Sequence, residues 1–322
     1  MSTDLLVIED QGGSQLDRPK LIAAAGPAAG FAFEEFFLGR LRNPYTRRAY
    51  LFAVRSFLSW VEGRQVELVR ITPGLVGQYF DQLAGSPPSK KLYLSAIRSF
   101  FDVLVQRHVI VLNPALSVRT ERYSAVEGRT PEISVDQVRK LLASIEPRCV
   151  VDLRDRAIVG TLIYTAARAG AVAKLRLKEF EFDGLQFSLR FAEKGGKARS
   201  IPVRADLQRY LQEYLLAGGL ESGDKDSPLF RTTGGRRASL SEQAMNGVDI
   251  CRMVKRRLKV AGLPTIISPH SFRSCAATDL LLQGVALEDV QYLLGHSDSR
   301  VTKLYDRRQK QVTRNIVERI SV

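Results

Sequence analysis

The sequence predicts a mainly α-helical protein with two domains, a helical bundle followed by a mixed α/β domain that is mostly helical and carries a small three-stranded antiparallel sheet. The chain has 322 residues, too many for one small core. Apolar residues recur at helical spacing along most of it. Short alternating segments separated by glycine-containing turns occur only in the second half. At 45% hydrophobic and 25% charged, the composition is that of a globular protein.

The first half divides into an arm and a helical unit. Residues 1–30 contain Gly12-Gly13 and a run of small residues without sustained periodicity, so we expect a flexible N-terminal arm. Residues 31–122 show helical periodicity, and we expect helices beginning near Phe33, at Pro44, at Thr72-Pro73 and near Ser89. This segment is predicted to be a bundle.

The second half begins after an interdomain linker, predicted over residues 123–133. Ser134 and Gln137 have the spacing of a capping box, so the next domain, 134–308, should open with a helix. Strands are expected over Phe180–Asp183, Gln186–Phe191 and Arg199–Val203. Everything after Arg204 is expected to be helical. The tail 309–322 repeats an apolar residue every four positions, which indicates a helix that docks on another surface.

The chain is strongly basic. It carries 48 Lys and Arg against 34 Asp and Glu, a net charge of +14, which favours a polyanionic partner. Residues 40–122 hold 13 basic and 5 acidic residues, and this concentration favours a DNA-binding module over a merely solvated face. The candidate DNA contacts are Arg47, Arg48, Arg55, Lys90, Lys91 and Arg98 in the bundle, and Lys197 and Arg199 in the second domain.

Several classes of protein are disfavoured. No apolar run approaches the roughly 18 residues of a membrane span, and Met1–Asp10 does not resemble a signal peptide. The three cysteines, Cys149, Cys251 and Cys275, fit reduced thiols in a cytoplasmic protein better than a disulfide framework or a zinc site. Neither a phosphate-binding glycine loop nor a two-metal carboxylate cluster is recognisable, so we expect no cofactor and no metal.

Four separated motifs carry chemically useful side chains. They are an arginine after an apolar helix (Arg168), a basic glycine turn between two strands (Lys194), the sequence Pro269-His270-Ser271-Phe272-Arg273, and Leu293-Leu294-Gly295-His296 followed nine positions later by Tyr305. Taken alone, each of these residues has a structural interpretation that needs no function. Arg168 fits a cation at a helix end, for example, and Tyr305 fits a tyrosine that packs in the core. The chain has only three histidines, however, and two of them lie in these motifs.

In order and spacing these motifs resemble the tyrosine recombinase (phage integrase) family, over roughly residues 35–310. The resemblance assigns the family's catalytic residues to Arg168, Lys194, His270, Arg273, His296 and Tyr305. It implies a core-binding domain at 31–122 and a catalytic domain at 134–308. The implied enzyme is a site-specific recombinase of the simple Xer/Cre-like type, such as a transposon or plasmid resolvase. It would use a 3′-phosphotyrosyl intermediate in DNA integration, excision or cointegrate resolution.

The chemistry explains why these residue types would be gathered. Planar guanidinium groups of Arg168 and Arg273 match the oxygens of a phosphodiester under attack, and His296 adds a donor. Tyr305, the nucleophile, must lose a proton, for which His270 is the candidate base. Lys194 could protonate the leaving 5′-hydroxyl.

The resemblance also implies partners: double-stranded DNA, a homotetramer on two paired sites, a possible accessory DNA-binding protein, and no membrane. It places the protein in the cytoplasm at the nucleoid, with the tail docking on a neighbouring subunit. The sequence departs from the family at Ala171, where an acid is usual, and at Ser274, where histidine is common. The alternatives are a type IB topoisomerase-like enzyme, a non-catalytic DNA-binding protein of the same fold, and a basic RNA-binding protein.

Overall fold

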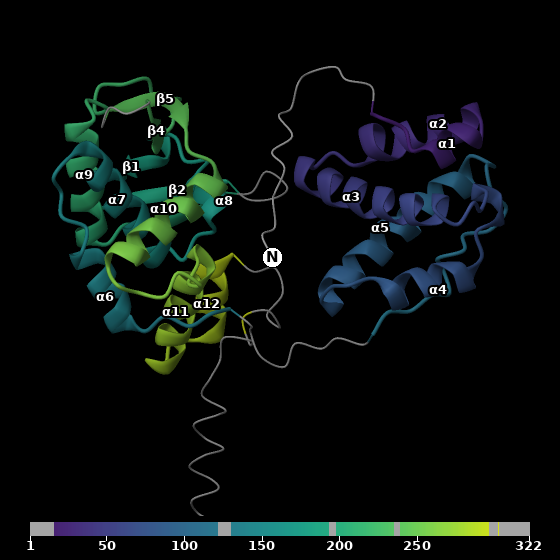
Figure 1. The fold of residues 1–322 in the computed structure, drawn as a ribbon. Helices are drawn as coiled ribbons and strands as arrows, with labels where there is room; N and C mark the ends of the chain where they lie inside the picture. Colours follow the sequence, from purple (N-terminus) through teal and green to yellow (C-terminus); the bar gives the residue numbers. More distant parts are fainter. Residues whose placement is uncertain (1–15, 122–129, 193–197, 235–238, 296–301, 303–322) are drawn as a thin grey trace, which may run out of the picture. The chain divides into compact units, whose positions relative to one another are not determined.

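The computed structural model describes residues 16–121, 130–192, 198–234, 239–295 and 302. The chain separates into two compact units, and the division after Ser124 falls within the segment predicted as a linker. Figure 1 shows the helices of each unit. Within the described ranges, no helix is both long and apolar enough to cross a membrane.

Every regular element that the structure describes in the N-terminal unit is helical. Its elements are α1 (Lys20–Ala24), α2 (Pro27–Glu34), a π-helical turn (Glu35–Arg40), α3 (Pro44–Glu62), a 3-10 turn (Leu68–Arg70), α4 (Pro73–Gln82) and α5 (Pro87–Gln106). Local sequence determines where they start. The Asn43 side chain accepts hydrogen bonds from the first backbone amides of α3, and Thr72 does the same for α4. Proline occupies the first turn of α2, α3, α4 and α5, where its missing N–H costs nothing.

Aromatic side chains fill the core of this unit. Phe33, Phe37 and Phe100 are fully buried, and their ring centroids lie 4.8–6.2 Å apart. Phe57 of α3 meets Phe101 of α5 edge to face at 6.0 Å. Such pairs add roughly 0.5–1.5 kcal/mol each beyond the area they bury. The packing of α3 on α5 is therefore the centre of the unit.

The predicted arm, residues 1–30, differs from the structure at its C-terminal end. Residues 20–30 form α1 and the start of α2, and Leu21 and Ile22 are buried in the core. The backbone N–H of Leu21 also donates to the Glu62 carboxylate at 2.8 Å. A five-residue helix is too short to display a period, which is why the sequence did not indicate it. Residues 1–15 lie outside the described residues.

The C-terminal unit is mixed. Its helices are α6 (Val135–Ala143), α7 (Val150–Tyr164), α8 (Ala169–Val172), α9 (Ala205–Ala217), α10 (Gly247–Val260), α11 (Pro269–Leu282) and α12 (Leu287–Leu294), and its strands are β1 (Phe180–Phe182), β2 (Phe187–Ala192), β3 (Ala198–Pro202), β4 (Arg231–Thr233) and β5 (Leu240–Ala244), with a 3-10 turn at Leu177–Glu179. Ser134 and Gln137 form the predicted capping box of α6. Strands β1, β2 and β3 form an antiparallel sheet in that order, which confirms the predicted three-stranded sheet.

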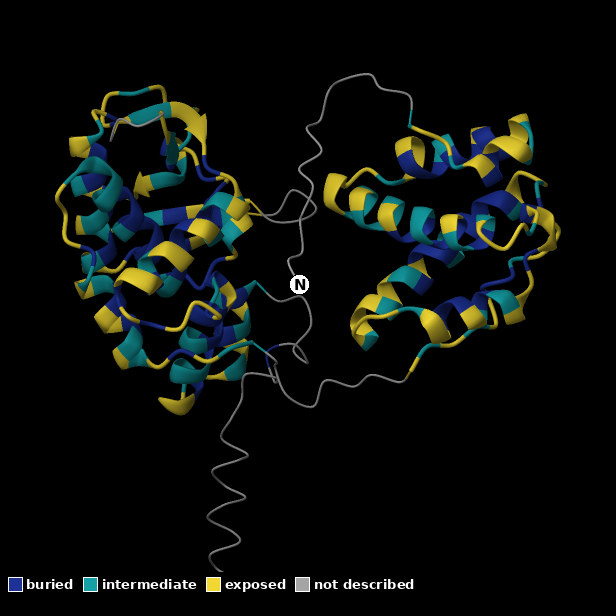
Figure 2. Cartoon of the chain, in the orientation of Figure 1, coloured by how far each residue is buried: buried dark blue, intermediate teal, exposed yellow. Residues whose placement is uncertain are grey.

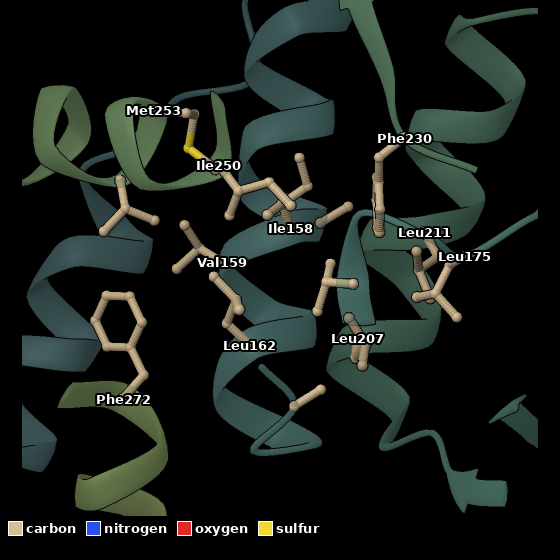
Figure 3. Close-up of a cluster of buried hydrophobic side chains, with 14 of the residues drawn as sticks. Ile158, Val159, Leu162, Leu175, Leu207, Leu211, Phe230, Ile250, Met253 and Phe272 are labelled. Carbon is tan, nitrogen blue, oxygen red and sulfur yellow. The ribbon is translucent and has the colours of Figure 1, made fainter. Parts of the chain in front are cut away.

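Helix α7 lies at the centre of this unit. Figure 3 shows Ile158, Val159 and Leu162 of α7 among side chains of α9, α10 and α11, and all three are fully buried. Figure 2 shows the same distribution, with buried residues concentrated inside each unit. This packing fixes the position of α7. Arg168 lies four residues after Tyr164, the last residue of α7.

The expectation that everything after Arg204 is helical was wrong at one place. Strands β4 and β5 pair antiparallel as a second, two-stranded sheet, with an irregularity between Arg231 and Thr233. These short segments are polar and do not alternate, so their sequence carries no strand signal. The sheet is defined by the pairing of the two strands with each other and not by the pattern of either segment.

A buried ionic network joins α7 to α10. Asp155 is completely buried, and one carboxylate oxygen accepts from the guanidinium of Arg154 at 2.7 Å. The other oxygen accepts from Arg256 at 2.6 Å and from Arg257 at 2.8 Å. Arg257 also donates to Asp152 at 2.6 Å. Buried charges need partners of this kind, and the network fixes α10 against α7.

Candidate active site

Helix α11 carries two of the predicted site residues within its first two turns. Ser268 precedes the helix, Pro269 opens it, and Ser271 accepts a hydrogen bond from the backbone N–H of Ser268 at 3.2 Å. His270 and Arg273 follow three positions apart, so they share one face of the helix. The unpaired backbone amides and the dipole of a helix N-terminus favour an anion at this end.

Arg273 joins three segments of the unit. It is 1% exposed, and its Nη1 donates to the carbonyl oxygen of Ala166 at 2.6 Å. Its Nη2 donates to the carbonyl oxygen of Leu294, the last residue of α12. Arg273 therefore links α11 to the chain just before Arg168 and to the chain just before His296.

The backbone at Ala166 turns sharply to present Arg168. Ala166 is buried and has a φ of +49°, a left-handed conformation that costs a non-glycine residue roughly 1–3 kcal/mol. The hydrogen bond from Arg273 holds this carbonyl in place. Arg168 then lies at the N-terminus of α8 with its side chain exposed, and the described residues provide no hydrogen-bond or ion-pair partner for its guanidinium.

The positive charges of two arginines affect the pKa of His270. Its side chain reaches the surface, yet desolvation by the surrounding protein lowers its pKa from the ordinary 6.5, and the positive charges of Arg273 and Arg168 lower that pKa further. Arg168 from one motif and His270 with Arg273 from another thus lie close enough for both arginine charges to act on the imidazole. A neutral imidazole beside two guanidinium groups can accept a proton next to a bound anion.

The remaining predicted catalytic residues, Lys194, His296 and Tyr305, lie outside the described residues. The structure describes the chain that leads to two of them. Strand β2 ends at Ala192 before Lys194, and α12 ends at Leu294, with Gly295 in the left-handed conformation just before His296. Lys197, a predicted DNA contact, also lies outside.

Two predicted DNA contacts of the N-terminal unit are exposed on helices that touch each other. Arg48 on α3 and Lys91 on α5 are exposed. The Tyr50 hydroxyl lies 3.2 Å from that of Ser95, and the rings of Phe52 and Tyr93 are 6.2 Å apart, so these parts of α3 and α5 are adjacent.

The other described residues predicted to contact DNA bind partners within the protein: Arg47 binds the carbonyl of Leu41, Arg55 the carbonyl of Asp17, Lys90 the carboxylate of Glu121 at 3.5 Å, Arg98 the carbonyls of Ala115 and Val118, and Arg199 the carbonyls of Tyr292 and Leu293. Arg98 and Arg199 each donate to two main-chain oxygens. A count of charged residues in the sequence does not distinguish a guanidinium group that binds main-chain oxygens inside the protein from one that is exposed to solvent.

Within the described ranges, no group of three or more His, Cys, Asp or Glu side chains could hold a metal ion. Cys149, Cys251 and Cys275 are free thiols, each partly buried. Of the two positions where the sequence departs from the family pattern, Ala171 lies in α8, and Ser274 is 8% exposed on α11.

Sequence reasoning missed the residues that support the site. The Asp155 network was not anticipated, and neither was the binding of Arg199 and Arg273 to the last carbonyls of α12, because the partners lie far apart in the sequence or are main-chain oxygens. The available signal was Asp155 within the apolar segment 152–165, since a carboxylate inside a buried helix demands a cation.

Comparison with known proteins covers both units. Residues 132–312 match the Phage integrase family, a range that includes all six predicted catalytic positions, and residues 33–108 match the N-terminal SAM-like domain of phage integrases. Tyrosine recombinase XerC of Pelobacter propionicus is 30% identical over 269 residues, which are 82% of this chain and 84% of that protein. Tyrosine recombinase XerD of Pseudomonas aeruginosa is 30% identical over 270 residues, 81% of this chain and 85% of the relative.

Solved structures share the fold. XerH site-specific recombinase in a post-cleavage complex with its palindromic difH substrate aligns with a TM-score of 0.70 and 18% identity, covering 95% of this chain and 91% of that one. A lambda integrase dimer (residues 75–356) bound to a COC′ core site aligns with a TM-score of 0.61 and 18% identity, covering 85% and 92%.

Proposed function

Because the chain belongs to the phage integrase family and is a tyrosine site-specific recombinase, we propose that it cleaves and rejoins double-stranded DNA through a 3′-phosphotyrosyl bond to Tyr305. The observation that carries the proposal is the contact between α11 and the chain before Arg168, where Arg273 donates to the carbonyl of Ala166 at 2.6 Å. The positive charges of Arg168 and Arg273 both act on the imidazole of His270 there. This grouping suits a phosphodiester anion next to a proton acceptor.

The proposed reaction is a transesterification. The Tyr305 oxygen attacks phosphorus while His270 takes the tyrosine proton, and the bond from phosphorus to the 5′-oxygen breaks. Lys194 gives a proton to that leaving oxygen. Arg168, Arg273 and His296 stabilise the charge that develops on the phosphoryl oxygens, and losing one such donor typically costs about 100- to 1,000-fold in rate.

Rejoining is the same reaction reversed. The 5′-hydroxyl of a strand attacks the phosphotyrosyl bond and releases Tyr305. The number of phosphoester bonds does not change, so the exchange needs no nucleotide hydrolysis. We propose integration, excision or cointegrate resolution as the biological reaction, at the nucleoid, with a transposon- or plasmid-borne resolvase as the preferred role.

DNA binding in the proposal relies on the N-terminal unit. Arg48 and Lys91 are exposed on the adjacent helices α3 and α5, where the rings of Phe52 and Tyr93 lie 6.2 Å apart. Arg47, Arg55 and Lys90 lie on the same helices, and their present partners are exchangeable carbonyl or carboxylate groups. The structural neighbours XerH and lambda integrase were solved with DNA, which supports the same partner here.

Assembly is proposed to be a homotetramer on two paired sites, with the tail 309–322 docking on a neighbouring subunit and an accessory DNA-binding protein as a further partner. A lambda integrase tetramer bound to a Holliday junction has this fold, with a TM-score of 0.61 and 18% identity. The tail lies outside the described residues.

Covalent trapping tests the proposal. Nicked duplexes from the DNA that flanks the gene would be mixed with the protein in EDTA and run on a denaturing gel. We expect a protein–DNA adduct that Tyr305→Phe abolishes and Tyr210→Phe, a matched change on α9, leaves intact. An adduct that survives Tyr305→Phe would refute the assignment of the nucleophile. Specific binding without any adduct would favour a non-catalytic DNA-binding protein, and relaxation of plasmids lacking a recognition site would favour a topoisomerase.

A further inference from the structure

Arg199 occupies an unusual position for a charged residue at the edge of a hairpin. It lies on β3 opposite Phe191 of β2, one pair beyond the Ala192–Ala198 pair next to the connection 193–197. The residue is 7% exposed, and its guanidinium carbon lies 5.9 Å from the centroid of the Phe191 ring. The charged group is therefore directed into the protein and not toward a solvated face.

The guanidinium meets the end of α12. Its Nη1 donates to the carbonyl oxygen of Tyr292 at 3.0 Å and to that of Leu293. The next carbonyl, that of Leu294, receives Arg273. The last carbonyls of a helix have no partner within the helix, and cations stabilise this negative end of the dipole. Three consecutive carbonyls are thus held by two arginines from different elements.

We propose that Arg199 is a positioning residue that holds the β2–β3 hairpin against the C-terminal end of α12. Lys194 follows two residues after the end of β2, and His296 follows two residues after the end of α12. Arg199 therefore connects the two described chain ends from which the proposed proton donor and the proposed phosphate-binding histidine follow in the sequence. The inference rests on the proposed function, because it assigns Arg199 a part in the same reaction.

This inference replaces the sequence-based expectation that Arg199 contacts DNA, and the two differ in measurable ways. A phosphate contact contributes to affinity and to its salt dependence, and removing one lowers the slope by about 1. A residue that holds two segments together affects the rate at saturating DNA instead. Misplacement by about 1 Å can slow a reaction by roughly 100-fold.

The experiment compares the full-length wild type with Arg199→Met and Arg199→Lys, and uses Arg190→Met as the matched control. Arg190 is exposed on the neighbouring strand β2, so its variant loses the same charge from the same sheet. Four quantities are measured: thermal midpoint, DNA affinity at several salt concentrations, single-turnover adduct formation at saturating DNA, and the same rate on DNA whose leaving 5′-oxygen is replaced by sulfur. A thiolate leaves without being protonated, so this substrate does not need Lys194.

We expect Arg199→Met to keep the affinity and salt slope of the wild type while forming the adduct about 10- to 100-fold more slowly. Arg199→Lys should recover part of the rate, because an ammonium group can still donate to a carbonyl. The defect of both variants should be several-fold smaller on the sulfur substrate, and Arg190→Met should behave like the wild type.

Several results would overturn the inference. A fall in affinity and salt slope that accounts for the slower rate would restore Arg199 as a DNA contact. If the Arg199 variants form the adduct as fast as the wild type, or are slowed equally on the oxygen and sulfur substrates, Arg199 does not influence proton donation to the leaving group. If Arg199→Met does not fold, the same comparisons on Arg199→Lys decide. If the wild type forms no adduct on either substrate, the proposed function itself fails, and this inference fails with it.

Discussion

At the scale of single residues, the environment of His270 determines which protonation state is present near neutral pH. Burial and the charges of Arg273 and Arg168 lower its pKa below the ordinary 6.5, so the imidazole is neutral at about pH 7 and able to accept a proton. A base must be unprotonated to act, so the same shift keeps it active at lower pH than a free imidazole would be.

We therefore predict that adduct formation loses rate only as the pH falls below 6.5. The rate should be level above that value and decline as His270 takes up a proton. The unfolded chain binds this proton more readily than the folded chain, so the contribution of His270 to stability also decreases as the pH falls through about 6.5. Single-turnover rates across the pH range, at saturating DNA, measure the first effect.

Direct titration of His270 by NMR provides the control, with His270→Gln assigning its signal among the three histidines. Arg168→Met removes one of the charges that lower the pKa, so the titration should move up toward 6.5. A pKa above 6.5 in the wild type, or one that Arg168→Met leaves unchanged, would contradict the electrostatic account of the site.

Residue identity was predictable from the sequence where chemistry is tied to order and spacing, and orientation was not. The motifs named Arg168, His270 and Arg273 as candidates, and in the structure the charges of both arginines act on His270. Their catalytic roles stay predictions. Arg98 and Arg199 looked like DNA contacts by charge alone. Their guanidinium groups instead donate to main-chain oxygens 17 or more positions away, a relationship that only the folded chain creates.

At the scale of elements, the Asp155 network should decide the stability of the C-terminal unit. Asp155→Ala would leave the buried guanidinium of Arg154 without its counter-charge and remove one of the two carboxylates that bind Arg257. Breaking a buried ion pair typically costs 3–5 kcal/mol, so we expect the free energy of unfolding to fall by about that amount. Urea unfolding followed by circular dichroism measures it.

Two controls accompany this prediction. Asp136→Ala removes a carboxylate whose ion pair with Arg139 is largely exposed, and should change stability by no more than about 0.5 kcal/mol. The only tryptophan, Trp60, lies in the N-terminal unit, so its fluorescence should follow a transition that Asp155→Ala does not shift. A loss of under about 1 kcal/mol would show that the network is not needed to hold α10 on α7.

Elements were predictable where their signals are local. The starts of α3, α4 and α6 follow from Asn43-Pro44, Thr72-Pro73 and Ser134, because caps and prolines act within one helical turn. Strands β4 and β5 were missed because their polar segments form a sheet only by pairing with each other. Tertiary packing thus overrides weak local preference at both α1 and β4–β5.

At the scale of the whole molecule, the division into two units has a consequence for DNA binding. Each unit has a hydrophobic core of its own. Under the proposed function both units bind the same DNA site, the N-terminal one through α3 and α5 and the C-terminal one around Arg168 and Arg273. Joining two modules makes the second binding event intramolecular, which raises affinity without any new contact.

We predict that the intact chain binds its site roughly 100- to 10,000-fold more tightly than residues 16–121 or residues 130–322 alone. Its affinity should also fall more steeply with salt than that of either fragment, because more phosphates are neutralised at once. Titrations of the intact chain, each fragment and their equimolar mixture on one duplex measure this, after circular dichroism confirms that the fragments fold. The mixture is the control, since it supplies the same contacts without the covalent connection. If the fragment mixture binds the duplex as tightly as the intact chain, the covalent connection contributes nothing to affinity. If one fragment alone binds as tightly as the intact chain, that unit alone recognises the DNA.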